Sequence, residues 1–294
     1  MRAERRVISK FFCLFMACAC MLFFTACSDY LALFDDPRFF KQISSAEELF
    51  DTINDGIYKF ENEIDVQTTT YDEFMDYWHE LEGQMALHSA FREQDVKIRY
   101  SNKEEGVCKI RIIMELNACG QAMQYLYAKN VNKYPSKEAE KVGEKLLEIK
   151  ETIVHDGMSD QDKVRAIHDF IISHYKYAVN GEVTQYSKVE VLFDERQGQC
   201  QAYAELFVAL CLLSGVQAQV ISGRSTFGFG DGAHAWCLVR IASIWYHVDP
   251  TWDDPIPDEP QMIRYDFYLK GDFTMTYTHT WCPYYMECFV DYAS

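Results

Sequence analysis

Hydrophobic residues recur every three or four positions in four stretches of the chain, which is the spacing of one face of a helix. Two of these stretches cover residues 46–57 and 71–90, a third follows the N-cap candidate Ser136, and a fourth begins near Ser159. Apolar and polar residues alternate instead in "KFENEIDVQ", "VKIRY" and "VCKIRIIMEL", as they do in half-buried strands. The pattern predicts a protein of the α+β class.

The run "CQAYAELFVALCLLSG" has apolar residues on nearly every side, so we predict a buried helix that starts at Cys200 and ends at Gly215. Two strand-like segments follow, "GAHAWCLVR" and "IWYHVDP". We expect them to form an antiparallel hairpin that turns near Ala242. The numbers of paired residues then sum to about 483, which places His234 opposite Asp249, at the roughly 5 Å between Cβ atoms of directly opposed residues.

The first 27 residues differ from the rest of the chain. Basic residues precede an uncharged apolar stretch, residues 11–26, which is shorter than the roughly 20 residues needed to cross a bilayer. Small residues precede Cys27, so we predict an export signal peptide over residues 1–27. The segment resembles the lipobox of bacterial lipoproteins, in which this cysteine is lipidated, although Phe24 stands where Leu is usual. The alternative is an ordinary signal peptide or an uncleaved anchor.

Either kind of signal predicts that the body of the protein works outside the cytoplasm. With a lipid at Cys27, we expect it to be anchored in the membrane, on the outer face of the bacterial cytoplasmic membrane or in the periplasm. Residues 28–45 would then be a tether, residues 46–134 a small α+β domain of unknown role, and residues 135–294 a second domain.

Charge narrows the range of partners. The 294 residues carry a formal charge of −17, and removal of residues 1–26 takes away four basic residues and one acidic residue, so the charge becomes −20. Such a surface repels nucleic acid and other polyanions. We therefore expect no nucleic-acid partner and interpret the charge as a solvated acidic surface.

Seven of the 11 cysteines follow Cys27. In an exported protein an odd number indicates one free thiol beside pairs, and Cys282 and Cys288 are close enough in sequence to be candidates for a disulfide. This count is compatible with a reduced Cys200.

Cys200 is a candidate nucleophile because the first turn of a helix favours a thiolate. Its alternative role is core filling, as for Cys211 in the same helix. A base and an orienting carboxylate favour the nucleophile, and His234 and Asp249 supply those two groups. His247 shares a strand face with Asp249 and competes as the base, but the expected register puts it opposite a tryptophan.

The segments "GQCQAYAELFVALCLLSGVQAQVISG", "GAHAWCLVR" and "WYHVDPTWDDP" resemble the three core blocks of the transglutaminase-like superfamily, over about residues 155–270. The resemblance implies a papain-like α+β core, in which a buried helix with the cysteine at its N-terminus packs on an antiparallel sheet. It further implies Cys200 as the nucleophile, His234 as general base and acid, and Asp249 as the orienting carboxylate.

The family chemistry implies attack on a protein or peptide amide, followed by acyl transfer, deamidation or proteolysis. For the oxyanion we expect the backbone N–H of Cys200 and one donor from Gln199, Trp236 or Tyr177. Cys200, His234, His247 and Asp249 have ligand types that suit zinc but lack paired close-spaced ligands, so we expect no metal; we also expect no cofactor. The alternative is a catalytically silent binding or scaffold module of the same fold in the cell envelope.

Overall fold

The computed structural model describes residues 3–8, 39–84, 90–179, 183–226 and 232–293. The predicted lipidation site Cys27 and most of the predicted tether lie outside these residues. The chain divides into two units, Met1–Asn117 and Ala118–Ser294, and each is described by itself. The mixed helix and strand content confirms the α+β prediction.

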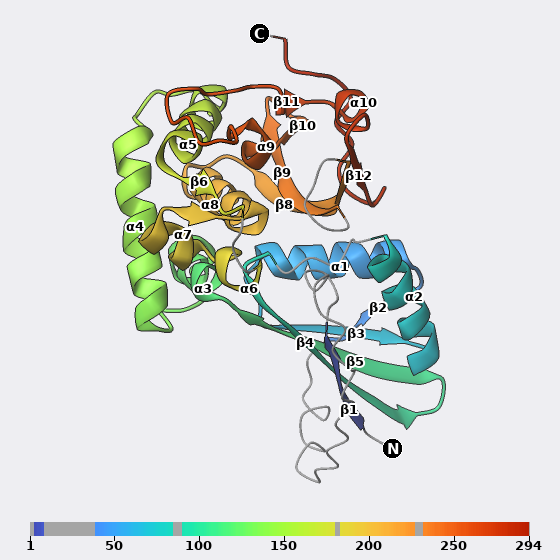
Figure 1. Ribbon diagram of the computed structural model, residues 1–294. Coiled ribbons are helices and arrows are strands. Elements are labelled where there is room, and N and C mark those ends of the chain that lie inside the picture. Colours follow the sequence, from blue (N-terminus) through green and yellow to red (C-terminus); the bar gives the residue numbers. More distant parts are fainter. Residues whose placement is uncertain (1–2, 9–38, 85–89, 180–182, 227–231, 294) are drawn as a thin grey trace. The chain divides into compact units, whose positions relative to one another are not determined.

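Unit 1 is a five-stranded sheet with two helices (Figure 1). Its elements are β1 (Ala3–Ile8), β2 (Lys41–Gln42), α1 (Ala46–Tyr58), β3 (Glu63–Thr68), α2 (Tyr71–Gly83), β4 (Arg92–Glu104) and β5 (Val107–Leu116). The strands lie in the order β1-β4-β5-β3-β2. Strand β1 lies within the predicted signal peptide, so a chain cleaved before Cys27 would lack β1 and leave β4 at the edge of the sheet.

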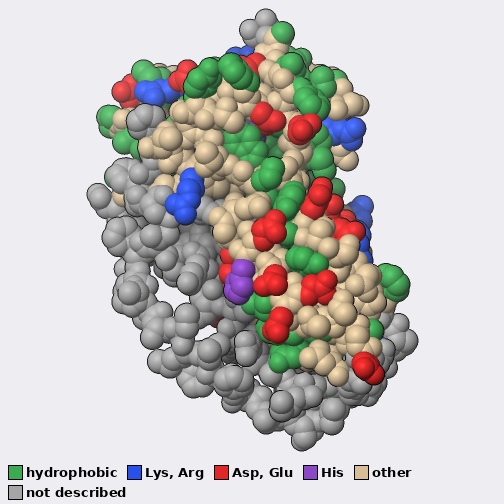
Figure 2. All heavy atoms as spheres, turned by 90° about the vertical axis from the view of Figure 1, so that its right-hand side faces the viewer, with side chains coloured by type: hydrophobic (Ala, Val, Ile, Leu, Met, Phe, Trp, Pro, Cys, Tyr) green, Lys and Arg blue, Asp and Glu red, His purple; other side chains and the backbone are tan. Residues whose placement is uncertain are grey.

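One buried ion pair joins neighbouring strands of unit 1. Arg111 on β5 faces Asp65 on β3, and two hydrogen bonds of 2.6 and 2.8 Å join the guanidinium to the carboxylate. The pairing uses Nε and Nη2 of a guanidinium that is only 1% exposed, and Oε2 of Glu63 lies 3.5 Å from its Nη1. Around helices α1 and α2, acidic side chains gather on the surface with few basic ones, as expected for a solvated acidic face (Figure 2).

Unit 2 begins earlier in the chain than the expected boundary at residue 135. Residues 118–128 form α3 (Ala118–Met123) and the π-helix η3 (Gln124–Ala128), which belong to unit 2. The side chain of Ser136, the N-cap of α4 (Lys137–Ile153), donates a 2.7 Å hydrogen bond to Gln121. Tertiary packing of α3 on α4 therefore decides the boundary, and the hydrophobic pattern alone does not reveal it.

The centre of unit 2 is the buried helix α8 (Cys200–Leu213), which packs on β8 (Ala218–Ser225) and β9 (Ala233–Ile241) (Figure 1). Helices α4, α5 (Asp160–His174) and α7 (Val189–Glu195) also contact α8. Burial of every α8 residue up to Leu212 explains its apolar composition, and Gly215 at φ +81° follows its end. The predicted central helix is confirmed.

The sheet of unit 2 has the order β11-β10-β9-β8-β12, and all four pairings are antiparallel. The remaining elements of the unit are β6 (Lys176–Tyr177), α6 (Val183–Tyr186), β7 (Gln197–Gly198), β10 (Ile244–Val248), α9 (Pro250–Asp253), β11 (Tyr268–Lys270), α10 (Asp272–Met275) and β12 (His279–Trp281). No helix in the described part of the chain is both long enough and apolar enough to span a bilayer.

The β9–β10 hairpin has a different register from the predicted one. Ala242 and Ser243 form a two-residue turn with φ values of 48° and 73°, so Ile241 pairs with Ile244. Extending this register places Asp249 across from Trp236 rather than His234. Because the shift is two positions, the same side chains still share a face of the sheet. The predicted face is therefore correct although the predicted partner residues are wrong.

Strand β12 pairs with β8 at the far side from β9, so residues distant in the chain meet next to the hairpin. Gly223 on β8 allows β12 to lie this close. A Cβ at this position would clash with the carbonyl oxygen of Thr280 and would lie 2.9 Å from the Trp236 ring. The consequence is that His279, the first residue of β12, reaches the hairpin face that carries His234.

Candidate active site

Cys200 is the first residue of α8 and is 5% exposed. Its backbone N–H is one of those that a helix leaves without an internal partner. Gly198 precedes it at the point where β7 pairs in parallel with β6, and a Cβ there would come within 2.8 Å of Leu192. The close packing of this turn places the thiol at the N-terminal end of the helix, where the dipole favours negative charge.

His234 lies between the thiol and a carboxylate. The thiol of Cys200 lies close enough to its imidazole to raise the pKa, and its Nε2 lies 2.6 Å from Oδ2 of Asp249. Burial alone would lower the pKa of His234, but Asp249 and Cys200 outweigh burial and raise it to about 10. The imidazole is therefore positively charged at neutral pH and can deliver a proton.

Asp249 is fully buried and caps helix α9. Its Oδ1 accepts hydrogen bonds from the backbone N–H groups of Thr251 and Trp252, at 3.0 and 3.2 Å. Burial would raise the pKa of this carboxyl, but His234 and His279 outweigh it and hold the pKa below its ordinary value. The structure thus brings together Cys200, His234 and Asp249.

His279 is a site residue that the sequence analysis missed. Its Nε2 lies 3.2 Å from Oδ2 of Asp249, the same oxygen that contacts His234, and the side chain is fully buried. The local sequence around residue 279 contains no spacing that relates it to the hairpin. Only the pairing of β12 with β8 reveals its position.

Tyr177 lies near the thiol, whereas Gln199 is engaged elsewhere. Burial, Cys200 and Asp249 raise the pKa of the Tyr177 phenol, so its hydroxyl remains a donor. The side-chain amide of Gln199 donates to the carbonyl of Ala178 at 3.2 Å and so holds the segment next to Tyr177.

Trp236 and His247 belong to a separate hydrogen-bonded chain. The indole N–H of Trp236 donates to Nδ1 of His247 at 3.0 Å, and Nε2 of His247 lies 2.8 Å from Asp272. This corrects the expectation that Trp236 could donate to the oxyanion, because its one N–H is already used. His247, the competing base of the sequence analysis, is also committed to this chain. The Trp236 ring instead stacks on His234 at 5.7 Å.

Among the described residues, two groups have the ligand types of a metal site, namely His247, Asp272 and Cys288, and His234, Asp249 and His279. Nδ1 of His247 accepts from an indole, so its Nε2 carries the proton and cannot bind a cation while that bond stands. In the second group, His234, Asp249 and His279 satisfy one another by hydrogen bonds. The residues present are explained as a hydrogen-bonded network.

The described cysteines after Cys27 are all free and buried, including Cys282 and Cys288, so the structure does not contain the candidate disulfide. Burial raises the pKa of several of these thiols, namely Cys108, Cys119, Cys211, Cys237 and Cys288. Cys200 differs from these five in its neighbour, because it lies beside the imidazole of His234.

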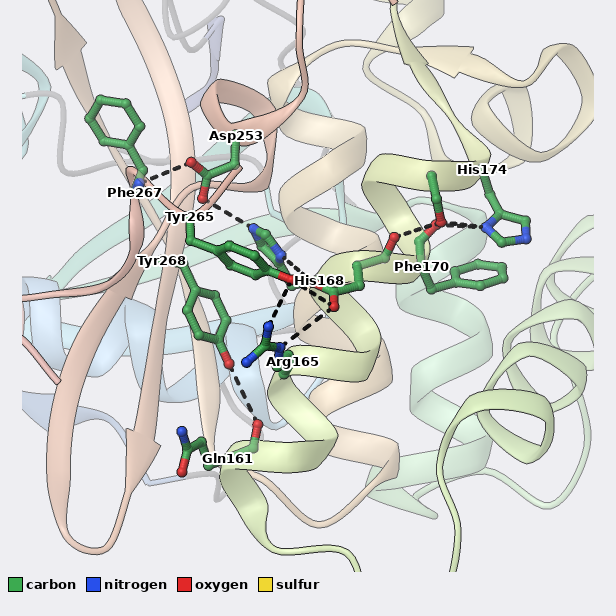
Figure 3. Close-up of polar contacts among 11 residues, drawn as sticks. Gln161, Arg165, His168, Phe170, His174, Asp253, Tyr265, Phe267 and Tyr268 are labelled. Atoms are coloured by element: carbon green, nitrogen blue, oxygen red, sulfur yellow. Dashed lines mark hydrogen bonds and ion pairs between the residues drawn. The ribbon is translucent and has the colours of Figure 1, made fainter. Parts of the chain in front are cut away.

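A second buried histidine supports the Asp249 turn from the other end of α9 (Figure 3). His168 on α5 has Nε2 3.1 Å from Oδ2 of Asp253 and Nδ1 3.0 Å from Oδ1 of Asp169. The Phe267 backbone links the two ends of α9, because its N–H donates to Asp253 and its carbonyl accepts from Asp249. His168 therefore supports the C-terminal end of the short helix whose N-cap is Asp249.

Aromatic and charged groups close the network around His168. The ring of Tyr265 stacks on the imidazole at 5.4 Å, and the Tyr265 hydroxyl donates to Asp169 at 2.9 Å. Arg165 lies over the Tyr265 ring at 4.8 Å. Burial would lower the pKa of His168, but Asp169 and Asp253 outweigh burial and raise it.

Comparisons with known proteins find similarity over the part of the chain that carries the candidate active site. Residues 148–250 match the family model of the transglutaminase-like superfamily, and this range contains Cys200, His234 and Asp249. The human protein named kyphoscoliosis peptidase is 31% identical over 136 residues, an alignment that covers 42% of this chain and 20% of the human protein. The mouse protein of the same name is 31% identical over 124 residues, which cover 38% of this chain and 19% of the mouse protein. The chain thus spans about one fifth of the length of these curated relatives.

Several solved structures align with part of the chain, among them these two. A TGase crystal structure aligns with 19% identity and a TM-score of 0.33, and covers 52% of this chain and 43% of that one. The periplasmic domain of TgpA from Pseudomonas aeruginosa aligns with 19% identity and a TM-score of 0.31, and covers 50% of this chain and 55% of that one. These TM-scores are low, so the assignment rests on the family model and on the site geometry.

The buried charge on His168 predicts a pH-dependent loss of stability in a His168→Gln variant. The raised pKa means that this ion network stabilises the fold fully below the ordinary pKa of histidine and ceases to do so as pH rises through the raised value. At pH 6 we expect the free energy of unfolding of the full chain to fall by about 2–4 kcal/mol, because Asp253 is left buried without its cation. Urea unfolding at several pH values measures the difference, which should shrink as pH rises.

The matched control is His155→Gln, which changes an exposed histidine outside the network. It should alter the free energy of unfolding by less than about 0.5 kcal/mol. If the free energy of unfolding of His168→Gln were lower by the same amount at every pH, the positive charge of this imidazole would not be what stabilises the fold.

Proposed function

We propose that this chain is a thiol enzyme that attacks protein or peptide amides, because residues 148–250 match the family model of the transglutaminase-like superfamily. The observation that carries the proposal is the position of His234, whose imidazole joins the thiol of Cys200 to the carboxylate of Asp249. A nucleophile, a base and an orienting group in this order are what acyl transfer requires. The human relative is named a peptidase, which agrees with chemistry on an amide.

The proposed reaction has two steps. Sγ of Cys200 forms a bond to the amide carbonyl carbon, the C–N bond breaks, and His234 gives its proton to the leaving nitrogen. In the second step His234 takes a proton from water or from an amine, whose oxygen or nitrogen attacks the thioester carbonyl. The C–S bond then breaks and the thiolate of Cys200 is regenerated beside the imidazolium.

The two steps use the surroundings of Cys200. While the carbonyl carbon is tetrahedral, the backbone N–H of Cys200 and the hydroxyl of Tyr177 are our candidates for the donors to its oxygen. Asp249 keeps Nε2 of His234 engaged, which leaves Nδ1 as the ring nitrogen for the thiol and the leaving group. Hydrolysis and transamidation differ only in the second nucleophile.

A second candidate function is a catalytically silent binding or scaffold module. Retention of the fold alone would support it equally well. The charged His234 between Cys200 and Asp249 favours the enzyme, because a binding module does not need a buried proton donor at the end of a helix that carries a thiol.

We also propose that the enzyme is exported and anchored in the membrane through a lipid on Cys27. The support is the sequence before this cysteine, where basic residues, an apolar stretch and small residues follow one another. A lipid anchor would hold the thiol enzyme at the outer face of the membrane and so present it to proteins of the cell envelope.

The first prediction from the proposed function concerns turnover. Wild-type full-length protein should release ammonia or amine from glutamine-containing peptides, or cleave them, and Cys200→Ala should reduce the rate at least about a thousandfold because the covalent step is lost. Mass spectrometry of the products separates deamidation, amine incorporation and cleavage. Cys211→Ala, in the same helix, is the control and should keep the activity; equal activity of wild type and Cys200→Ala would exclude the thiol mechanism.

The second prediction concerns the alkaline limb of the pH–rate profile. The pKa of His234, raised to about 10, means that kcat/KM should fall as pH rises through this value and the imidazolium is lost. Asp249→Asn removes the charge that raises this pKa, so the limb should move down toward the ordinary pKa of about 6.5, with kcat at least about a hundredfold lower. A limb that does not move would show that His234 is not the acid.

The third prediction concerns the anchor. Cells that express the full chain and are fed an alkyne-tagged fatty acid should produce labelled protein, and Cys27→Ser should abolish the label because the acceptor thiol is gone. Cys20→Ser, a cysteine inside the apolar stretch, should leave the label in place. Label that persists in Cys27→Ser would place the lipid elsewhere.

A further inference from the structure

We infer that His279 is a positioning residue of the proposed active site: as a neutral imidazole it donates its Nε2–H to Oδ2 of Asp249 and so limits how strongly this carboxylate retains the proton of His234. The inference rests on the proposed function, because it assigns His279 a role in the protonation of the leaving group. It adds a fourth side chain to the set of Cys200, His234 and Asp249.

The hydrogen bonds determine which nitrogen of His279 carries the proton. An ionised carboxylate only accepts hydrogen bonds, so Nε2, at 3.2 Å from Oδ2 of Asp249, must be the donor. Nδ1 lies 2.8 Å from the hydroxyl of Thr278, which can donate to it. Burial lowers the pKa of His279 although Asp249 opposes this, so the ring is neutral at neutral pH. Both ring nitrogens are thus satisfied by a neutral imidazole.

The carboxylate of Asp249 has four donors for its two oxygens. Oδ1 accepts from two backbone N–H groups, which fix the orientation of the carboxylate at the start of α9. Oδ2 is shared between His234 and His279, at 2.6 and 3.2 Å. A donor on a carboxylate lowers its affinity for any second proton, so His279 weakens the hold of Asp249 on His234.

This tuning matters because His234 has two opposed tasks. It must stay charged beside the thiolate of Cys200, and it must release its proton to the leaving nitrogen. A carboxylate that served His234 alone would favour the first task at the expense of the second. Other titratable groups act on these residues without a hydrogen bond to Oδ2 of Asp249: Tyr177 from β6, Cys237 from β9 and Asp253 from α9 act on Asp249, and His247 from β10 acts on His279.

A packing role is the main alternative, since aromatic rings surround His279. The ring centroids of Trp236, Trp252 and Phe267 lie 4.9, 4.7 and 5.5 Å from that of His279. Two substitutions separate these roles. His279→Phe keeps an aromatic ring but has no donor, whereas His279→Gln keeps an N–H donor but has no ring.

The experiment compares two substrates that differ in the leaving group. The full chain and both variants are assayed with a peptide amide, whose nitrogen must be protonated by His234, and with the p-nitrophenyl ester of the same acyl group, whose leaving group needs no proton. We expect His279→Phe to lower kcat/KM for the amide about tenfold and to change that for the ester less than about threefold, consistent with one lost hydrogen bond to a charged group. We expect His279→Gln to recover most of the amide rate relative to His279→Phe.

A spectroscopic measurement tests the same point without turnover. Loss of the donor at His279 should strengthen the hydrogen bond between His234 and Asp249. In a proton NMR spectrum the Nε2 proton of His234 should therefore resonate further downfield in His279→Phe than in the wild type. In His279→Gln its chemical shift should be close to the wild-type value. If the wild type turns over no amide, the proposed function fails, yet this proton resonance still decides whether His279 tunes the pair. Near-ultraviolet circular dichroism checks that each variant is folded.

Three results would overturn the inference. The first is the reverse order, with His279→Phe close to wild type and His279→Gln impaired, which assigns His279 to packing. The second is a decrease in kcat/KM that is equal for the amide and the ester in both variants. The third is stoichiometric zinc or iron in the purified protein that is lost in both variants, since two histidines and one carboxylate also form metal sites.

Discussion

The hydrogen bond between His234 and the buried Asp249 is the interaction on which the rest of the site depends. Burial by itself would neutralise both groups, since an isolated charge is costly in the protein interior. Their contact at 2.6 Å reverses this, raising the pKa of the imidazole and lowering that of the carboxyl. A charged pair in the interior requires further hydrogen bonds, and the Asp249 carboxylate accepts them from two backbone N–H groups and from His279.

Two further histidines support Asp249 in different ways. His279 contacts the carboxylate directly, while His168 holds the other end of helix α9 through Asp253. The Phe267 backbone hydrogen-bonds to residues at both ends of α9. Because α9 has only four residues, it has little helical stability of its own, and the tertiary contacts must fix it. Buried imidazoles therefore support both the carboxylate and the helix turn that presents it.

Two parts of unit 2 supply the catalytic groups of the proposed enzyme. Helix α8 carries the thiol at its first residue, and the β9–β10 hairpin carries the histidine and leads into the carboxylate. The sheet that holds the hairpin also packs on α8, so the thiol and the imidazole are positioned by one core. Members of one superfamily can perform different reactions on such a core, and the nucleophile of the second step decides which product forms.

From the amino-acid pattern we could predict the longer helices, the buried helix, the two hairpin strands and the proposed residues Cys200, His234 and Asp249, because periodicity and local spacing are properties of the chain alone. Family resemblance then related these residues to thiol chemistry. Tertiary structure alone decided the hairpin register, since a turn of Ala242 and Ser243 without glycine has no strong sequence signal. It also decided the positions of His279, which reaches Asp249 only through the pairing of β12 with β8, and of His168, which lies 85 residues from Asp253 in the chain. Contacts between distant segments arise from packing, and no local pattern encodes them.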